Sequence, residues 1–234
     1  MPTVLTFGAR NLGAGITEHF AGRGWDVAAV ARSQETVDKL AERVPGALGI
    51  VGDVTHPDQV AETAFAVRER FGSLDLIVNA ASPGRRPPGP FGGGPLLEAT
   101  PEAFEAYAID VARMAYAFLS AGSRSLKQLS GGGTLIQITG GSSRRALPGK
   151  GPWAAGAFAT RALAQSAAQE LRPDGIHAAL LVVDAVIRRP DSDPSDELAE
   201  EQDVAQAVDY LASQAPTAWT HELVVTPKGD TWTP

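Results

Sequence analysis

The sequence predicts a single α/β domain built on a doubly wound parallel sheet of about seven strands. Short apolar runs alternate with longer amphipathic segments along the chain, which is typical of βαβ units. The apolar runs consist mainly of Val, Ile, Leu and Ala, so they suit strands that helices cover on both faces. A glycine-rich turn follows the first run directly, as it does where such folds bind a phosphate group.

The elements follow one another in a regular order. Seven strands are predicted at 4–8, 26–31, 47–52, 74–80, 134–139, 177–183 and 222–226. Six helices are predicted at 13–22, 34–43, 57–71, 101–129, 152–171 and 201–213. The fourth helix has the clearest start, with Thr100 as N-cap and Pro101 at the first helical position. Thr55 is expected to cap the third helix. No repeat or linker divides the 234 residues, so we expect one domain over 1–234.

Two irregular segments interrupt this order. Residues 81–100 are dense in Pro and Gly and follow the fourth strand at its C-terminal end, where doubly wound folds bind ligands. We expect them to form a substrate loop. Residues 184–201 carry several Pro and acidic residues before the last helix, and this composition predicts a mobile segment.

The composition excludes several classes of function. A net charge of −7 argues against general binding of nucleic acid, which needs a basic surface. No apolar run approaches the roughly 18 residues of a membrane span, and the first strand leaves no room for a signal peptide, so a cytoplasmic protein without a membrane partner is expected. There is no Cys and the four His are isolated, so no thiol catalysis and no metal site are expected.

The turn FGARNLGAGIT predicts a dinucleotide site. Gly13 and Gly15 would let the backbone approach a pyrophosphate, whose charge then lies on the N-terminus of the following helix. A glycine-rich run alone is weak evidence, but here it follows a strand and opens a helix at the start of an alternating pattern. The alternative is a tight turn that binds nothing.

The end of the second strand favours NADP(H) over NAD(H). An acidic residue there would bind the ribose hydroxyls of NAD and repel a 2′-phosphate. The chain instead has Arg32 and Ser33, a cation and a hydroxyl donor, and Arg10 in the glycine turn adds a second cation. The alternative is that Arg32 is a solvated loop residue.

With these features the chain resembles the short-chain dehydrogenase/reductase family over essentially its whole length, which implies a Rossmann-like fold. Gly8–Gly15 matches the family motif Thr-Gly-x-x-x-Gly-x-Gly, with Gly8 in place of Thr and Ala9 in place of the first Gly. Asp53-Val54 resembles the pair that contacts adenine, and Asn79-Ala80 resembles the start of the family's Asn-Asn-Ala-Gly. The predicted cofactor-binding residues are Gly8, Arg10, Asn11, Leu12, Gly13, Gly15, Arg32, Ser33, Asp53, Val54, Asn79 and Ala80.

The resemblance fails at the catalytic end. In the family a Tyr is the general acid/base, a Lys four residues later lowers its pKa, a Ser binds the substrate oxygen and an Asn supports a proton relay. Counted from the segment RALAQS, the Tyr, Lys, Asn and Ser positions hold Trp153, Ala157, Ala112 and Gly140. An indole N–H donates a hydrogen bond but does not titrate, so the catalytic residues are unknown and the active site is degenerate.

Two side chains could substitute for the missing groups. Ser142 lies close to the family's Ser position. Tyr116 lies one helical turn beyond Ala112, and its alternative is a place in the core.

Three pairs of arginines follow strands four, five and six and predict a basic rim at the C-terminal sheet edge. They are Arg85-Arg86, Arg144-Arg145 and Arg188-Arg189. Such a rim would bind a small-molecule anion, such as a phosphate, a carboxylate or a coenzyme A ester. The alternative is exposed loop arginines that the acidic residues of 191–201 partly neutralise.

The resemblance also implies an assembly and a lid. Residues 184–201 take the place of the family's substrate lid. The family uses the fifth helix with the fourth for subunit contacts, and the fifth helix here is rich in small residues, so a homodimer or homotetramer is expected.

Two functions remain open from the sequence. The first is an atypical oxidoreductase that binds NADP(H) and acts on a small carbonyl or alcohol compound with a non-standard catalytic site. The second is a non-redox protein on the same scaffold, either an isomerase, lyase or cyclase or a cofactor-sensing binding protein.

Overall fold

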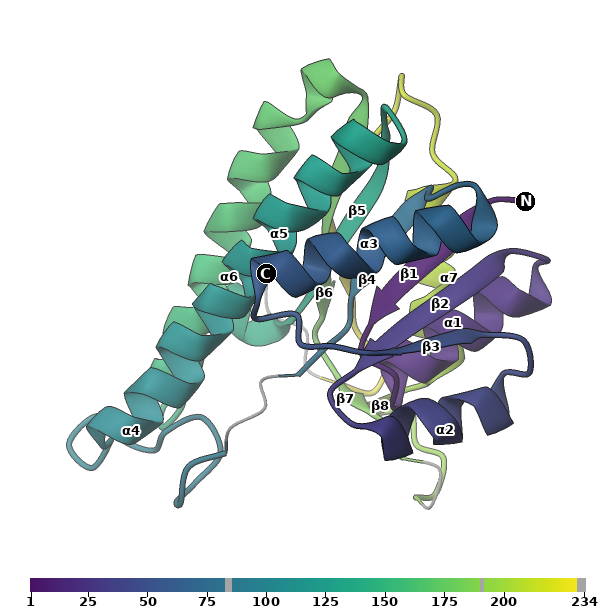
Figure 1. Ribbon diagram of the computed structural model, residues 1–234. Coiled ribbons are helices and arrows are strands. Elements are labelled where there is room, and N and C mark those ends of the chain that lie inside the picture. The colour runs from purple at the N-terminus through teal and green to yellow at the C-terminus, as the bar shows by residue number, and fades with distance from the viewer. Residues whose placement is uncertain (83–85, 190–191, 231–234) are drawn as a thin grey trace.

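The computed structural model describes residues 1–82, 86–189 and 192–230, and it confirms the predicted fold class. One parallel sheet runs in the order β3-β2-β1-β4-β5-β6-β9 (Figure 1). Its strands are β1 Thr3–Phe7, β2 Asp26–Ala31, β3 Leu48–Val51, β4 Leu76–Asn79, β5 Gly133–Gly140, β6 Ile176–Val183 and β9 Glu222–Val225. The order reverses between β1 and β4, which are hydrogen-bonded neighbours although two strands, β2 and β3, lie between them in the chain. A doubly wound sheet binds its ligand at such a reversal.

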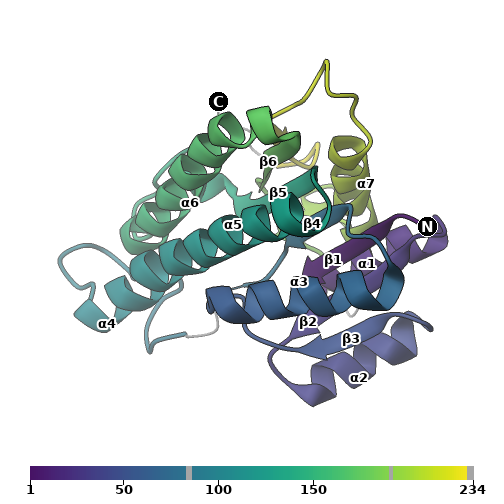
Figure 2. The same ribbon diagram turned by 45° about the horizontal axis from the view of Figure 1, so that its top comes forward.

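Helices cover both faces of the sheet, as Figure 2 shows for α3, α5 and α6 on one face. The helices are α1 Leu12–Gly22, α2 Gln34–Arg43, α3 Pro57–Phe71, α4 Pro101–Phe104, α5 Asp110–Leu129, α6 Gly151–Glu170 and α7 Glu201–Ala212. Alternate residues of β1 serve two cores: Leu5 and Phe7 pack with α3, α5 and α6, whereas Val4 packs with α1, α2 and α7. This burial of both faces explains why the strands read as continuous apolar runs.

The segment predicted as one helix over 101–129 contains a π-helix. Thr100 caps α4 as predicted, because its side chain accepts a hydrogen bond from the backbone N–H of Ala103. Residues Glu105–Ile109 then form the π-helix η1, and α5 follows without a break in helical backbone. Nothing in the local sequence pattern predicts this wider turn. A π turn inside a helix is rare and is frequent at functional sites.

The cap predicted for the third helix is wrong. His56, not Thr55, occupies the N-cap position of α3, and its side chain makes no capping bond. Thr55 instead donates its hydroxyl to the carboxylate of Asp53 at 2.8 Å. The hydroxyl is therefore engaged in the turn before the helix.

The segment predicted to form a mobile lid contains a short two-stranded ribbon that the sequence did not predict. Its strands are β7 Val186–Ile187 and β8 Leu198–Ala199, which pair in parallel. Pro190 and Asp191 lie outside the described residues.

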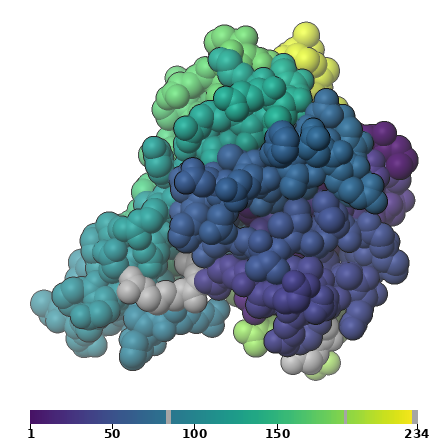
Figure 3. Space-filling model, viewed as in Figure 1, coloured from purple at the N-terminus to yellow at the C-terminus, as the bar shows by residue number. Residues whose placement is uncertain are grey.

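The substrate loop lies against the start of α6. Gly94 forms a β-bridge with Lys150, and the backbone N–H of Trp153 donates to the carbonyl of Gly92 at 3.3 Å. Figure 3 shows α4 and the adjoining segment projecting from the rest of the molecule at the lower left. The short helix η2 (Gly141–Ser143) follows β5 directly and contacts α6. Since residues 91–94 are bound to the start of α6, they lie beside the carboxyl end of β5.

Candidate functional site

The glycine turn closes tightly between β1 and β4. Gly8 has φ 108°, and a Cβ added to it would lie 2.9 Å from the carbonyl oxygen of Ala80. A Cβ added to Gly13 would lie 2.0 Å from the carbonyl oxygen of Gly8, closer than any real contact allows. Both positions therefore require glycine, and the turn lies at the reversal of strand order.

The N-terminus of α1 opens from this turn without a side-chain cap. Asn11 occupies the N-cap position with φ 43°, and its side chain makes no capping bond. The first N–H groups of a helix, together with the helix dipole, attract an anion. Leu12 packs on the core beneath the turn. The turn therefore fits a pyrophosphate by its shape and by its donors.

Gly15 has a packing role in this structure. A Cβ added to it would lie 2.7 Å from Cβ of Glu201, so glycine lets α1 approach α7 closely. The carboxylate of Glu201 also accepts a hydrogen bond from Arg43 of α2 at 2.9 Å. The approach of Gly15 to a pyrophosphate stays a prediction.

Two exposed arginines belong to this region, Arg10 in the turn and Arg32 after β2. Arg10 and Arg32 are exposed, and no ion pair to either is recorded within the described part of the chain. Arg32 follows β2, whose last residue is Ala31 rather than an acid. Ser33, the next residue, caps α2 by accepting a hydrogen bond from the N–H of Thr36 at 3.4 Å. Its hydroxyl therefore lies at the N-terminus of α2.

The residues predicted to contact the nucleoside are partly engaged in the protein itself. The Asp53 carboxylate accepts hydrogen bonds from the backbone N–H and the hydroxyl of Thr55. Val54 is buried in the core. Asn79 is fully buried; its amide donates to Gln137 at 3.0 Å and accepts from the N–H of Ala81. The bond to Gln137 ties the end of β4 to β5.

An aromatic cluster of Phe91, Tyr107 and Trp153 forms around Trp153, the residue predicted to stand at the family's Tyr position. Trp153 lies in the first turn of α6, with its ring 5.1 Å from that of Phe91 and 6.1 Å from that of Tyr107, centre to centre. The Phe91 and Tyr107 rings are 5.6 Å apart and nearly perpendicular. The sequence did not single out Phe91, and it gave Tyr107 no role in the site. A large aromatic residue in the loop after β4 was the only signal for Phe91.

The residues predicted at the other three positions of the family's tetrad carry no reactive group. Ala157 is buried, and Ala112 and Gly140 are half-buried. Beside them, Ser142 is half-buried, and Ser143 donates its hydroxyl to the carbonyl of Gly140 at 2.9 Å.

Tyr116 does not lie in the core. Its side chain is 57% exposed on α5, so the core alternative is wrong. No ring contact joins it to the aromatic cluster among the residues that the structure describes.

The predicted basic rim is partly paired. Arg145 lies 3.3 Å from the carboxylate of Asp184, and Arg188 donates to Glu200 at 2.5 Å and to the carbonyl of Ser192. The bond to Glu200 raises the pKa of Arg188 above its ordinary value. Arg86 and Arg189 are exposed, Arg144 is half-buried, and Arg85 lies outside the described residues. Anion binding by the rim stays a prediction.

The sequence did not single out Asp184, which pairs with Arg145 of the predicted rim. It follows β6, and its carboxylate lies against Gly141, where an added Cβ would meet Oδ1 at 1.8 Å. The position at the carboxyl end of a central strand was the signal that could have found it.

Two classes of site find no support in the described chain. No group of three or more His, Cys, Asp or Glu side chains is placed to hold a metal ion there. None of the helices in that part is long and apolar enough to cross a membrane.

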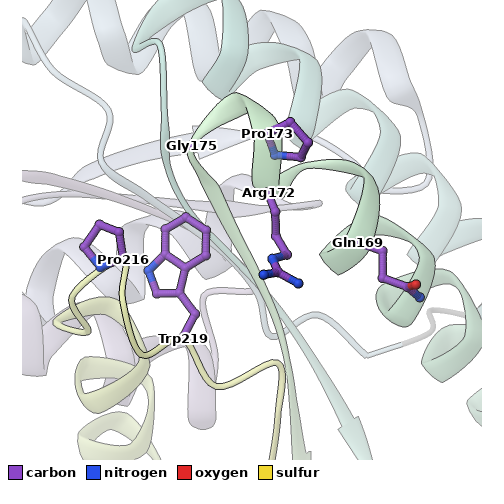
Figure 4. Close-up of a pocket in the computed structure, with 6 residues that line it drawn as sticks. All are labelled: Gln169, Arg172, Pro173, Gly175, Pro216 and Trp219. Atoms are coloured by element: carbon purple, nitrogen blue, oxygen red, sulfur yellow. The ribbon is translucent and has the colours of Figure 1, made fainter.

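A separate hollow of about 750 Å³ lies at the opposite end of the sheet (Figure 4). Arg172 and Gly175 border it just before β6, and Trp219 borders it just before β9. Figure 4 shows Arg172 and Trp219 lying on neighbouring sides of the hollow. The amino ends of these strands are remote from the glycine turn, so the hollow is not part of the cofactor cleft.

His177, stacked under Trp219, predicts a pH dependence of stability. The two rings are 5.0 Å apart and 7° from parallel, and His177 is 2% exposed. Burial lowers the pKa of His177 below its ordinary value, with the nearby His221 adding to this and the carbonyl of Thr220 opposing it. As the pH falls below 6.5, the unfolded chain takes up a proton that the folded protein does not. The free energy of unfolding should therefore be highest above that pH and fall below it, by at most about 1.4 kcal/mol per pH unit.

Urea unfolding at pH 5.5 and pH 7.5 measures this loss. His177→Phe keeps a ring beneath Trp219 and should lose this part of the pH dependence, whereas His56→Gln, a change at an exposed histidine, should keep it. An unchanged pH dependence in His177→Phe would assign the effect to other groups.

Comparisons with known proteins agree with this geometry. A family model described as enoyl-(acyl carrier protein) reductase matches residues 8–230. An uncharacterized oxidoreductase of Mycobacterium tuberculosis is 30% identical over 91% of this chain and 85% of its own. The L-2,3-butanediol dehydrogenase of Corynebacterium glutamicum is 31% identical over 74% of this chain and 66% of its own.

Solved structures match over nearly the whole chain. A short-chain dehydrogenase from Rhodopseudomonas palustris is 28% identical with a TM-score of 0.75, over 97% of this chain and 98% of its own. A metagenomic short-chain oxidoreductase in complex with NADP is 25% identical with a TM-score of 0.77, over 97% of both chains. These relatives do not favour the non-redox alternative.

Proposed function

Because the chain belongs to the short-chain dehydrogenase/reductase family, we propose that it binds NADP(H) at the glycine turn and transfers hydride to or from a small molecule. The turn itself carries this proposal. Gly8 and Gly13 admit no side chain, and the N-terminus of α1 offers uncapped N–H donors at the reversal of strand order. The nicotinamide of such a cofactor supplies the hydride chemistry that the described side chains lack.

The two exposed arginines support NADP(H) over NAD(H). Among the residues that the structure describes, neither Arg10 in the turn nor Arg32 after β2 pairs with a carboxylate, and Ala31 leaves no acid to repel a 2′-phosphate. Several of the structural relatives bind this nucleotide: one is described in complex with NADP, and another, a ketoreductase, with NADPH.

The test is a titration of the purified protein with NADPH and NADH, followed by tryptophan fluorescence. Micromolar NADPH binding with much weaker NADH binding is the expected result. Arg32→Asp should weaken NADPH binding by roughly 10- to 100-fold, because a charge-assisted contact is worth about 1.5–3 kcal/mol. NADH binding should hold or improve.

Arg23→Asp is the matched control, since Arg23 is also an exposed arginine but lies at the far end of α1 and pairs with Asp209. If Arg32→Asp and Arg23→Asp lose the same amount of NADPH affinity, Arg32 does not contact the nucleotide. If the unsubstituted protein binds neither NADPH nor NADH, the proposed function is wrong.

The chemistry at the nicotinamide end would differ from that of the family's ketoreductases. Trp153 and Ala157 replace the Tyr and Lys that deliver a proton, and loss of such general acid catalysis costs about 10²–10⁴ in rate. We propose a small carbonyl or alcohol compound, or an acceptor that needs no proton, as the substrate. Anion binding by the rim and a homodimer or homotetramer remain proposals as well.

A further inference from the structure

The aromatic cluster of Phe91, Tyr107 and Trp153 offers ring faces where the family has a proton donor. Tyr107 is 3% exposed and meets both other rings edge to face, whereas Phe91 is 51% exposed and Trp153 is half-buried. The Phe91 and Trp153 rings are tilted by 52°, so they do not cover one another fully. Part of each of these two rings therefore remains exposed, where a ligand can reach it.

The backbone holds these two rings in place before any ligand binds. The N–H of Trp153 donates to the carbonyl of Gly92, next to Phe91, and Gly94 bridges to Lys150. A Cβ added to Gly93 would lie 2.6 Å from the ring of Pro152, so the loop lies tightly on the first turn of α6. A surface that is ordered in advance loses little entropy on binding.

Aromatic faces of this kind attract organic cations. A cation within about 6 Å of a ring centre is drawn to the negative face of the ring, and Trp is the strongest partner. The one such contact recorded in the described chain is Arg70 over Phe71 on α3, so none of its own cations is recorded over this cluster. Arg145 is paired with Asp184, while Lys150, the N-cap residue of α6, lies beside Gly92 and is a cation that would oppose a cationic ligand.

A cationic acceptor also removes the need for the missing proton donor. When a hydride reaches the carbon of a neutral ketone, the oxygen must gain a proton. When a hydride from NADPH forms the new C–H bond at an iminium carbon, the electron pair of the C=N bond returns to nitrogen. The products are a neutral amine and NADP⁺, and no proton is consumed.

We infer that the faces of Phe91 and Trp153 bind an organic cation and that the substrate of this site is an iminium ion. The inference rests on the proposed function for the hydride, but the binding of the cation can be measured by itself.

Isothermal titration of the protein with N-methyl-dihydroisoquinolinium, first without nucleotide and then with NADP⁺ present, tests the binding without turnover. This probe carries a permanent positive charge and no anionic group, so its binding does not depend on the predicted rim. The neutral bicyclic ketone tetralone has nearly the same shape and is the control ligand. The cation should bind at least about 10-fold more tightly than tetralone. Equal affinities would overturn the inference.

Matched variants locate the binding. Phe91→Leu and Trp153→Leu should each lower the affinity for the cation by about 10-fold. Phe65→Leu is the control, because Phe65 on α3 is exposed to a similar degree, 55% against 51%, and lies outside the cluster. Equal effects of Phe91→Leu and Phe65→Leu would overturn the assignment to this cluster.

An assay of NADPH oxidation then distinguishes the reaction. NADPH should be oxidised by the iminium probe, and tetralone, whose oxygen needs a proton donor during hydride transfer, should be reduced at least about 100-fold more slowly. Reduction of tetralone at the same rate would overturn the choice of substrate. If NADPH binds but the cation does not, this inference fails and the proposed function stands. If the cation binds but NADPH does not, the proposed function fails instead.

Discussion

Replacing Gly13 by Ala is expected to raise the Kd for NADPH by at least about 100-fold. The added Cβ would lie 2.0 Å from the carbonyl oxygen of Gly8 and 2.6 Å from its carbonyl carbon. Both atoms belong to the backbone, so no side chain can rotate away, and the turn must open. An opened turn would displace the first N–H groups of α1, and a 100-fold loss corresponds to about 2.7 kcal/mol. Fluorescence titration measures the affinity.

Gly22→Ala is the matched control for this prediction. It adds the same methyl group to the same helix at a position where nothing lies within 4 Å. NADPH affinity should be unchanged in this variant. Circular dichroism of both variants shows whether Gly13→Ala still folds, and a folded Gly13→Ala with unchanged affinity would show that the turn does not bind the nucleotide.

Replacing Gly156 by Ala is expected to destabilise the fold by about 2 kcal/mol. The added Cβ would lie 2.4 Å from the carbonyl oxygen of Tyr107 and 2.9 Å from Cβ of Val111, so α6 and the π-helix η1 would have to separate. Ala is favoured over Gly inside a helix by about 1 kcal/mol, but overpacking of a buried contact costs about 1–3 kcal/mol or more when the backbone must move. The melting temperature should fall by about 4–8 °C.

Scanning calorimetry with two neighbouring variants checks the cause. Ala155→Gly on the exposed side of α6 should cost only about 1 kcal/mol through helix propensity, with no contact involved. Gly156→Ala should also weaken binding at the aromatic cluster, because Trp153 and Tyr107 lie on the two elements that separate. If Gly156→Ala is as stable as the unsubstituted protein, the contact between α6 and η1 can relax around the added methyl group.

The sheet and its helices could be predicted because their signals are local. Runs such as 177–183 are apolar on both faces, and Thr100-Pro101 marks a helix start whatever lies around it. The seven strands and the cap at Thr100 are confirmed. The cap at Thr55 failed because the hydroxyl had a nearer partner in Asp53, and a sequence pattern does not rank such competing bonds.

The candidate site could be predicted only where one stretch of chain builds it. The glycine turn is contained in residues 8–15, so its shape follows from its sequence. The aromatic cluster unites Phe91, Tyr107 and Trp153 from three separate segments, and only the fold brings them together. The pairing of Arg145 with Asp184 is likewise a contact between the ends of two strands, so the rim looked more basic in the sequence than it is.

The π-helix η1 makes this part of the chain intolerant of any change in length. Each residue of an α-helix turns the chain by about 100° and advances it by about 1.5 Å. Deleting one residue of Glu105–Ile109 would therefore rotate the start of α5 relative to its neighbours and move Val111 off Gly156. The exposed end of the preceding segment, near Leu96 and Leu97, carries no such constraint. Among natural variants of this chain, insertions and deletions should accumulate there and be absent from 105–112.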